Sequence, residues 1–308
     1  MSSGIYILCP GQGAQIVGMA RDLYDASPAA RAVFDQANQQ IGFDLSAICF
    51  NGPAEKLNQT DIAQPALFVA GVASFKAAVE SGVFDAVNIK AFAGLSLGEY
   101  TALHLAGAFT FEEGLRLVAR RGRLMQDAAV ATPSGMVAII GADEALVRGI
   151  CEQAAEGEVL VPANFNSPGQ IVISGAINAC KRAVGVAGDA GVSGKSLAVA
   201  GAFHSPLMQS AADGMKAELA AANFQKPVVP VYSNVTARVH GDIESIKRLL
   251  VEQIVQPVRW EQTMTTIAAA PAPDSRFIEL APGRTLTGLL KRINRRLPVE
   301  ENAGWKKT

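Results

Sequence analysis

The sequence predicts an α/β protein in which a small domain interrupts a larger core. Two patterns predict this fold: apolar strand-like runs alternate with helix-like segments along the chain, and a β-α-β-β-α-β order occurs in its middle. Apolar residues make up 49% of the 308 residues and charged residues 18%, which excludes a disordered chain. The 27 Lys and Arg nearly balance the 28 Asp and Glu, and the net charge of −1 argues against nucleic acid or a membrane surface as a partner.

The first half of the chain predicts strands that end in tight turns and helices that start at recognisable signals. An apolar run ends at Pro10, as expected for a buried strand that enters a turn. Pro65 is compatible with the first turn of a long helix, and Thr110 forms a capping box with Glu113 that starts another. The expected elements are strands 5–9 and 86–94 and helices around 23–34, 61–79, 97–106 and 111–129.

A change of texture at Thr132-Pro133 marks the start of the small domain. Four strand patterns and two helix patterns follow in the order of a ferredoxin-like domain. The strands are expected at 136–140, 160–164, 171–174 and 194–199, and the helices at 144–155 and 177–190. We therefore expect a small domain at 132–202, inserted into a discontinuous core formed by 1–131 and 203–308.

The core resumes after residue 202 with further alternating elements. Helices are expected at 206–222, 243–255 and 286–295, and strands at 229–233 and 277–280. From residue 298 onward the chain is polar and is expected to be loose.

The four cysteines predict a reduced, cytoplasmic protein. Cys9, Cys49, Cys151 and Cys180 are widely spaced with no CxxC pair, which is typical of buried free thiols. The N-terminus has no signal-peptide pattern, and its early apolar run is too short to span a membrane. The three histidines lie far in sequence from the cysteines and from one another, so no metal site is expected.

The strongest chemical signal is Gly94-Leu-Ser-Leu-Gly98 between a predicted strand and a predicted helix. This is the G-x-S-x-G nucleophile elbow, in which a sharp turn presents the serine and the glycines let strand and helix approach closely. Ser96 would then lie at a helix N-terminus, whose free amides suit an oxyanion. The alternative is a helix N-cap serine among small residues, but the strand and helix flanks favour a catalytic serine.

A serine nucleophile needs a base, and the chain has three histidines. His204 follows a predicted strand and precedes a helix, in a loop position that often displays catalytic groups. His104 lies on an apolar helix and is expected to be a satisfied core or edge histidine, whereas His240 lies in a polar turn and is expected to be solvated. His204 is therefore the expected base.

A second turn rich in glycine, at 10–15, directly follows the first strand. Its open backbone amides are suited to complete an oxyanion hole. A dinucleotide-binding loop is the obvious alternative, but Ile16 stands where the third glycine of that fingerprint is required.

The helix at 111–129 carries one arginine in an unusual place. On a helical wheel, Arg116, Arg120 and Arg123 face solvent, whereas Arg121 falls at the edge of the apolar arc. A buried guanidinium is costly unless it meets an anion, and its planar fork fits a carboxylate. Two alternatives stay open: a side chain that extends along the helix to solvent, and pairing with an internal glutamate.

These features belong to a series of motifs that resembles malonyl-CoA:acyl-carrier-protein transacylases, the acyltransferase family of fatty-acid synthesis that is related to polyketide acyltransferase domains. The resemblance covers about residues 4–297. The motifs are PGQGAQ at 10–15, GPAEKLNQT at 52–60, QPALF at 64–68, GLSLGEYTAL at 94–103, RRGRLMQDA at 120–128, NFNSPGQIVISG at 164–175, GAFHSPLM at 201–208, QPVRW at 256–260 and APGRTLTGLLKRI at 281–293.

The resemblance implies a role for each candidate residue. Ser96 would carry the malonyl ester, and His204 would be its general base and later its acid. The backbone amides of Gln12 and Leu97 would form the oxyanion hole. Arg121 would bind the free malonyl carboxylate, in agreement with its place on the wheel.

Further residues would orient the base and shape the pocket. The resemblance implies that the backbone carbonyl of Gln256 orients His204, and that Asn166 and Gln170 face the site from the small domain. Phe203 stands where methylmalonyl-selective relatives carry Ser, so it would leave little room for an α-methyl group. Leu95 departs from most bacterial relatives, which have His there, and removes any hydrogen bond from that histidine.

The resemblance implies an α/β-hydrolase-like core with a mostly parallel sheet and a ferredoxin-like insertion. The expected reaction is ping-pong transfer of malonyl from malonyl-CoA to the phosphopantetheine thiol of acyl carrier protein, with no metal or cofactor and malonyl-CoA as a substrate only. A monomer is expected. Alternatives are a discrete polyketide or malonate-decarboxylase acyltransferase, a serine thioesterase, and a non-catalytic docking subunit. The candidate docking patch for the acidic carrier is Lys291, Arg292, Arg295 and Arg296, although these cations also complement a helix C-terminus.

Overall fold

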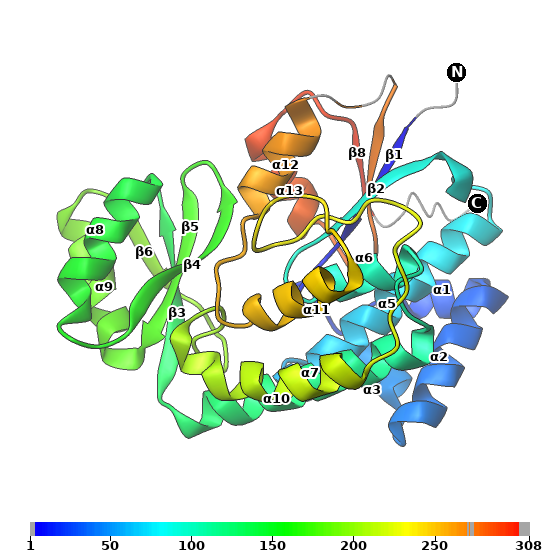
Figure 1. Cartoon of the computed structure of the whole chain (residues 1–308), viewed down its shortest axis with the longest axis horizontal. Helices are drawn as coiled ribbons and strands as arrows, with labels where there is room; N and C mark the ends of the chain where they lie inside the picture. Colours follow the sequence, from blue (N-terminus) through cyan, green and yellow to red (C-terminus); the bar gives the residue numbers. More distant parts are fainter. Residues whose placement is uncertain (1–3, 270, 272–273, 302–308) are drawn as a thin grey trace.

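The structure, a computed structural model, describes residues 4–269, 271 and 274–301. Each of its two sheets has four strands. A larger core holds the first sheet and most of the helices, and a smaller lobe holds the second sheet (Figure 1). The predicted class, an α/β fold with a mainly parallel core sheet and a second small sheet, is confirmed.

The core sheet is parallel throughout its described pairs and has the order β2-β1-β7-β8. Its strands are β1 (Ile5–Cys9), β2 (Ile89–Gly94), β7 (Arg276–Glu279) and β8 (Val299–Glu300). The expectation of a loose tail from residue 298 was wrong at its start, because Val299–Glu300 pairs with β7 and Glu300 accepts a hydrogen bond from Arg276 Nε at 2.6 Å. Residues 302–308, the rest of that tail, lie outside the described part of the chain.

The strand expected at 229–233 is reduced to an isolated parallel bridge between Phe92 and Val231. Pro227 and Pro230 precede that bridge, and proline has no N–H to donate to a sheet. The segment therefore lies along the edge of β2 without forming a regular ladder, although Phe92 N still donates to Pro230 O at 2.9 Å.

Helices cover the core sheet. They are α1 (Arg21–Ala26), α2 (Pro28–Ile41), α3 (Leu45–Asn51), α4 (Ala54–Leu57), α5 (Thr60–Glu80), α6 (Gly98–Leu105), α7 (Phe111–Ala131), α10 (Gln209–Ala221), α11 (Ile243–Glu252), α12 (Trp260–Ala269) and α13 (Thr285–Ile293). The single helix expected near 23–34 is broken at Ser27, whose Oγ accepts from Ala30 N and caps α2, with Pro28 at its first position. The sequence did not reveal α3, α4 or α12.

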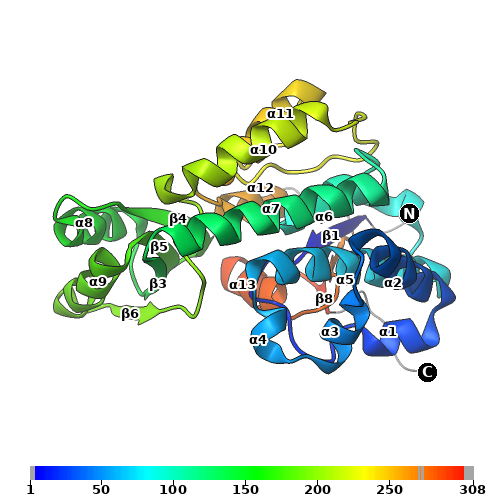
Figure 2. The same ribbon diagram turned by 90° about the horizontal axis from the view of Figure 1, so that it is seen from below.

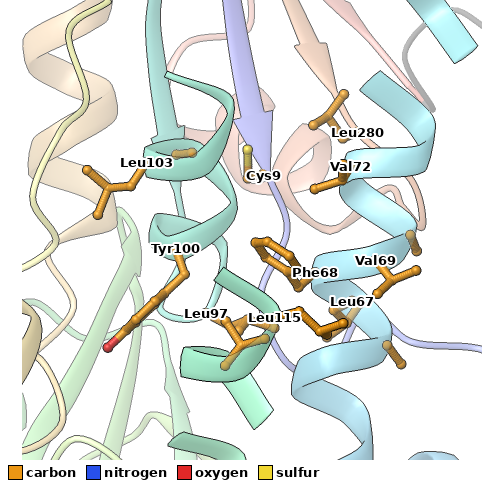
Figure 3. Close-up of a cluster of buried hydrophobic side chains, with 14 of the residues drawn as sticks. Cys9, Leu67, Phe68, Val69, Val72, Leu97, Tyr100, Leu103, Leu115 and Leu280 are labelled. Carbon is orange, nitrogen blue, oxygen red and sulfur yellow. The ribbon is translucent and has the colours of Figure 1, made fainter. Parts of the chain in front are cut away.

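Helix α5 forms the centre of the core. It is long and apolar enough to cross a membrane, but 83% of its most apolar window is buried inside the protein, so it is a core helix. Figure 3 shows side chains of α5, α6 and α7 packed beside Cys9 at the end of β1, with Phe68 and Tyr100 among them. This packing makes the end of β1, where the candidate site begins, a rigid platform.

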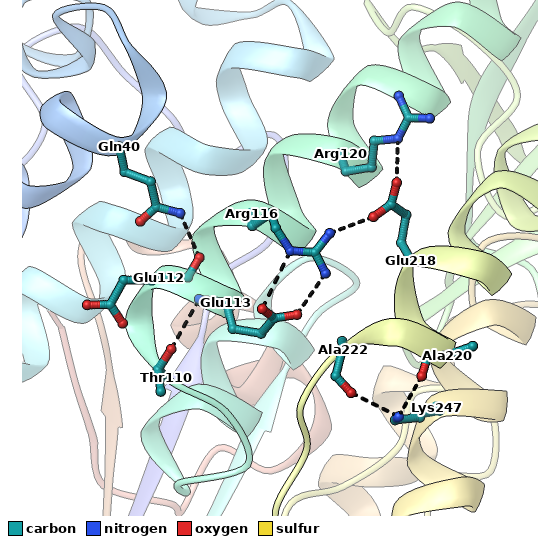
Figure 4. A network of polar contacts seen from close by, with 10 residues as sticks. All are labelled: Gln40, Thr110, Glu112, Glu113, Arg116, Arg120, Glu218, Ala220, Ala222 and Lys247. Carbon is teal, nitrogen blue, oxygen red and sulfur yellow. Dashed lines mark hydrogen bonds and ion pairs between the residues drawn. The ribbon is translucent and has the colours of Figure 1, made fainter.

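The solvent face of α7 is joined to α10 by ion pairs. Arg116 and Arg120 both bind Glu218 of α10, at 2.5 and 3.0 Å (Figure 4). Lys247 of α11 donates to the carbonyls of Ala220 and Ala222 at the end of α10. Figure 2 shows that α7 runs from the core to the small lobe beside α10. Because Arg116 and Arg120 form their ion pairs on the surface of α7, the predicted solvent face of this helix is confirmed.

The small lobe has the strand order β4-β5-β3-β6 with antiparallel neighbours, as in a ferredoxin-like domain. Its elements are β3 (Ser134–Ile140), α8 (Glu144–Ala155), β4 (Leu160–Ser167), β5 (Gln170–Ala176), α9 (Ile177–Asp189) and β6 (Ser193–Ser196). Alternate residues of β3 serve two cores: Val137 and Ile139 pack under α8 and α9, whereas Met136 and Ala138 face the main core. The limits at 132 and 202 remain predictions.

Candidate active site

Ser96 lies in a strained turn between β2 and α6. Its φ is 52°, which places a non-glycine residue in the left-handed region. A Cβ on Gly94 would lie 1.9 Å from the carbonyl carbon of Gly98, and one on Gly98 would lie 2.0 Å from Cys9 O. Only glycine therefore allows β2, the turn and the end of β1 to approach so closely, as the elbow pattern predicts.

His204 contacts Ser96 directly. Ser96 Oγ and His204 Nε2 are 2.9 Å apart, and both residues are buried. His204 also has a positive φ of 59°, so the loop before the 3₁₀ helix Pro206–Met208 turns the ring into the site. The geometry matches a nucleophile paired with its base.

The backbone group that orients His204 is Gln253 O, at 2.7 Å from Nδ1, and not Gln256 as expected. Gln253 follows the last residue of α11, so its carbonyl has no partner within the helix and is free to accept. Gln256 lies three residues further on, and its backbone has only a smaller effect on the pKa of His204. Since a carbonyl only accepts, Nδ1 carries the proton and Nε2 accepts from Ser96 Oγ.

Burial and the nearby Arg121 lower the pKa of His204 to about 4, against the hydrogen bond to Gln253 O. The imidazole is therefore neutral at pH 7. We expect single-turnover acylation to keep its full rate as the pH falls through 6.5, and to lose it only near pH 4. A pH–rate profile by rapid quench measures this, and an acid limb near 6.5 would contradict it.

The same shift has a consequence for stability. Between pH 6.5 and about 4 the unfolded chain protonates this histidine while the folded chain does not, so the free energy of unfolding falls as the pH falls through that window. Above pH 6.5 the group contributes no pH dependence. Urea unfolding of the wild type and of His204→Gln at both ends of the window checks the sign.

Arg121 is fully buried beside Ser96. One terminal nitrogen donates to Gln64 Oε1 at 2.8 Å, and the other donates to Ser96 Oγ at 3.1 Å and to Gln253 Oε1 at 2.8 Å. Its Nε has no hydrogen-bond partner, and no described carboxylate forms an ion pair with it. Both alternatives from the wheel are thereby excluded: the side chain neither extends to solvent nor pairs with an internal glutamate. Burial lowers its pKa from 12.5.

Two backbone amides near Ser96 are free to bind an oxyanion. Within residues 4–269, 271 and 274–301, neither Gln12 N nor Leu97 N donates a hydrogen bond. Gln12 follows β1 and Leu97 precedes α6, and a Cβ on Gly11 would lie 2.2 Å from Leu95 O, so the two turns are tightly apposed. Free amides suit a developing negative charge, and that of Leu97 lies at the N-terminus of α6.

A cleft of about 400 Å³ opens above Ser96 and His204 between the core and the small lobe. Phe203, Asn166 and Gln170 line it, as expected, together with Leu95. Gln170 Oε1 also accepts from Arg292 at 2.8 Å, which joins the small lobe to α13 at the cleft. The other three cations of the candidate patch are exposed at or after the end of α13.

A buried polar network beneath the site was missed from the sequence. Asn234 Oδ1 accepts from Ser96 N at 2.6 Å, and Glu99 binds His240, Asn234 and Gln253. The expectation that His240 is solvated was wrong, because its side chain is 1% exposed and its Nε2 lies 2.7 Å from Glu99 Oε1. The signal that could have found it was a glutamate in the apolar segment 94–103, which requires a buried partner.

His104 is a satisfied core histidine, as predicted. Its Nδ1 lies 3.0 Å from Phe109 O, and its ring contacts three phenylalanines. Burial lowers its pKa. Among the described residues, no cluster of three or more His, Cys, Asp or Glu is placed to bind a metal ion.

Comparison with known proteins places this geometry in a family. The acyl transferase domain model matches residues 6–307. The malonyl CoA-acyl carrier protein transacylase of Salmonella typhimurium is 42% identical over 92% of this chain and 91% of its own length. The transacylase structure from Coxiella burnetii is 39% identical with a TM-score of 0.93, covering 98% of this chain and 94% of that one.

A further structural relative was solved in a complex. It is a malonyl-transacylase bound to a type II polyketide acyl-carrier protein, 39% identical with a TM-score of 0.92, covering 97% of this chain and 96% of that chain. The strained serine, its histidine and the parallel core sheet thus occur in a chain that matches transacylases over nearly its whole length. The chain belongs to the acyl transferase domain family and is an acyltransferase.

Proposed function

We propose that this protein transfers malonyl from malonyl-CoA to the phosphopantetheine thiol of acyl carrier protein through a malonyl ester on Ser96. One observation carries the proposal: Ser96 Oγ contacts both a neutral histidine, at 2.9 Å, and a buried guanidinium, at 3.1 Å. The histidine activates the nucleophile, and the guanidinium provides the positive charge that a malonyl carboxylate requires. A simple acyl hydrolase has no use for such a charge beside its nucleophile.

In the first half-reaction Ser96 Oγ attacks the thioester carbonyl and its proton passes to His204 Nε2. Gln253 O holds the Nδ1 proton, so the imidazolium that forms is stabilised without a carboxylate. The oxyanion is bound by the free amides of Gln12 and Leu97. The C–S bond then breaks, and His204 returns the proton to the CoA sulfur as the malonyl ester forms.

The malonyl carboxylate binds Arg121. Two of its present acceptors, Gln64 Oε1 and Gln253 Oε1, are neutral amide oxygens, and its Nε is unpaired. A carboxylate is a stronger acceptor than an amide, so the guanidinium can turn to it without breaking an ion pair.

In the second half-reaction the carrier's thiol attacks the ester, with His204 as base and then as acid. The cytoplasm is the proposed compartment, since all four cysteines are free and buried. Phe203 is 6% exposed at the cleft wall, and we propose that its ring excludes an α-methyl group. Fatty-acid synthesis is the proposed pathway. Polyketide synthesis is the alternative, because a related transacylase was solved with a polyketide acyl-carrier protein.

The deciding experiment is intact mass spectrometry after incubation with malonyl-CoA, acetyl-CoA or methylmalonyl-CoA. We expect one malonyl adduct on Ser96, little acetyl and less methylmalonyl. The adduct should persist in water and disappear when holo acyl carrier protein is added. An adduct that water removes as fast as the carrier does would indicate a thioesterase instead.

The cationic patch predicts a salt-dependent second half-reaction. Reversing Lys291 and Arg295 to Glu should raise the KM for the acidic carrier by about 10-fold at low salt, while acylation by malonyl-CoA is unchanged. Lys181, exposed on α9, provides the matched control for charge reversal. An equal KM for the carrier in the double variant would show that these cations serve only the end of α13.

A further inference from the structure

A buried carboxylate lies directly beneath the reacting groups without touching the cleft. Glu99, in the first turn of α6, is 0% exposed. Its Oε1 lies 2.7 Å from His240 Nε2, and its Oε2 accepts from Asn234 N at 3.1 Å and from Gln253 Nε2 at 2.8 Å. Three donors therefore converge on one side chain that the transfer steps do not use.

The first of these partners holds the nucleophile. Asn234 Oδ1 accepts from Ser96 N at 2.6 Å, and its Nδ2 donates to Gly94 O at 2.7 Å. The Asn234 side chain thus binds both limbs of the turn that keeps Ser96 at its strained φ. Such strain persists only where the surroundings enforce it.

The second partner holds the base and the guanidinium. Gln253 O binds His204 Nδ1, Gln253 Oε1 accepts from Arg121, and Gln253 Nε2 donates to Ser96 O at 2.9 Å. The Gln253 side chain is fixed at its Nε2 end by Glu99. Through two amides, one carboxylate is connected to all three groups that meet at the reacting atoms.

A carboxylate fits this position better than a neutral side chain. Its two oxygens accept from three donors. A glutamine at the same place has one oxygen, and its NH₂ group would face one of these three donors. Its negative charge is also separated from Arg121 by the Gln253 amide. Arg121 therefore gains a nearby counter-charge and keeps its own donors free of a competing carboxylate.

We propose that Glu99, held by His240, is a positioning residue that keeps the nucleophile, the base and the carboxylate-binding arginine in register. The inference rests on the proposed function of the same site. His240 lies between Glu99 and the protein surface. Its Nδ1 is buried without a hydrogen-bond partner among the described residues, and the residue lines a surface groove of about 170 Å³.

Glu99→Gln tests the proposal with little change of shape. The variant can still fold, because His240 can move its proton to the unpartnered Nδ1 and accept at Nε2. We expect the acylation rate at saturating malonyl-CoA to fall about 10²-fold, because Asn234 and Gln253 lose the charged acceptor that fixes them and the reacting groups are held less exactly, while KM stays about the same. The ¹⁵N shifts of His240 should report the changed tautomer.

Glu279→Gln is the matched control. Glu279 is also 0% exposed and accepts from two backbone amides, Leu286 N and Thr287 N, but it has no contact with the site. We expect it to lower the melting temperature at least as much as Glu99→Gln while leaving the acylation rate unchanged. A purely structural role for Glu99 would make the two variants alike.

His240→Ala provides a second, independent measurement. It removes one donor from Glu99 and leaves room for imidazole between Glu99 and the groove, so the acylation rate should fall and added imidazole should restore part of it. Wild-type rates in both Glu99→Gln and His240→Ala would overturn the proposal, as would a rise in KM with an unchanged rate. If Glu99→Gln does not fold, an unchanged rate in His240→Ala overturns it. A wild type that forms no Ser96 adduct overturns the proposed function and this inference together, whereas an active wild type confines the failure to the inference.

Discussion

Replacing Ser96 by alanine is expected to abolish the malonyl adduct and to reduce carrier malonylation by at least about 10³-fold. The reason is that Oγ contacts both His204 Nε2 and the Arg121 guanidinium. Whatever rate remains reflects substrate binding and the oxyanion amides. Intact mass and a carrier malonylation assay measure the two effects.

Ser174→Ala is the matched control for that substitution. Ser174 is buried in β5 and its hydroxyl has no partner, so its loss tests general effects of removing a buried serine oxygen. We expect wild-type adduct formation in this variant. An adduct that forms on Ser96→Ala at the wild-type rate would place the nucleophile elsewhere and refute the assignment.

Replacing Arg121 by alanine is expected to reverse the substrate preference. Losing a buried ionic partner of the malonyl carboxylate costs about 3–5 kcal/mol, or roughly 10²–10⁴-fold in kcat/KM for malonyl-CoA. Acetyl-CoA has no carboxylate to lose, and its transfer should change much less. Removing this charge also removes one cause of the low pKa of His204, so the acid limb of acylation should move toward higher pH.

The control for this variant is Arg120→Ala on the same helix. Arg120 is exposed and binds Glu218 of α10, so it tests the loss of a guanidinium from α7 without touching the site. Its selectivity should match the wild type. Equal losses of malonyl and acetyl transfer in Arg121→Ala would mean that the arginine supports the site only structurally.

Local chemistry explains which parts of the site were predictable. The G-x-S-x-G spacing encodes its own turn, because the two glycines are required wherever strand and helix approach within the space of a Cβ. Arg121 was conspicuous because helical periodicity reports which face is buried. Both patterns involve only residues close in sequence to the one whose position they predict.

The errors concern contacts between segments that are distant in sequence. The sequence around His240 is polar, so this histidine was expected to be solvated. Its partner is the carboxylate of Glu99, which lies 141 residues away in the sequence. Gln253 directly follows the end of α11 at Glu252, and its carbonyl is free to bind His204 Nδ1. The resemblance assigned this role to Gln256 through the motif at 256–260, and a shift of three residues in such an assignment changes which carbonyl reaches the histidine.

The sequence by itself determined the α/β class, the strained serine turn, the histidine that contacts this serine and the unusual arginine. These depend on local spacing and on side-chain chemistry that the chain carries wherever it folds. Only the tertiary structure decided that Gln253 orients His204 and that Glu99 joins two amides beneath the nucleophile. The physical reason is that a buried polar group must find its partners in three dimensions, and those partners came from α6, from the segment after Val231 and from the end of α11.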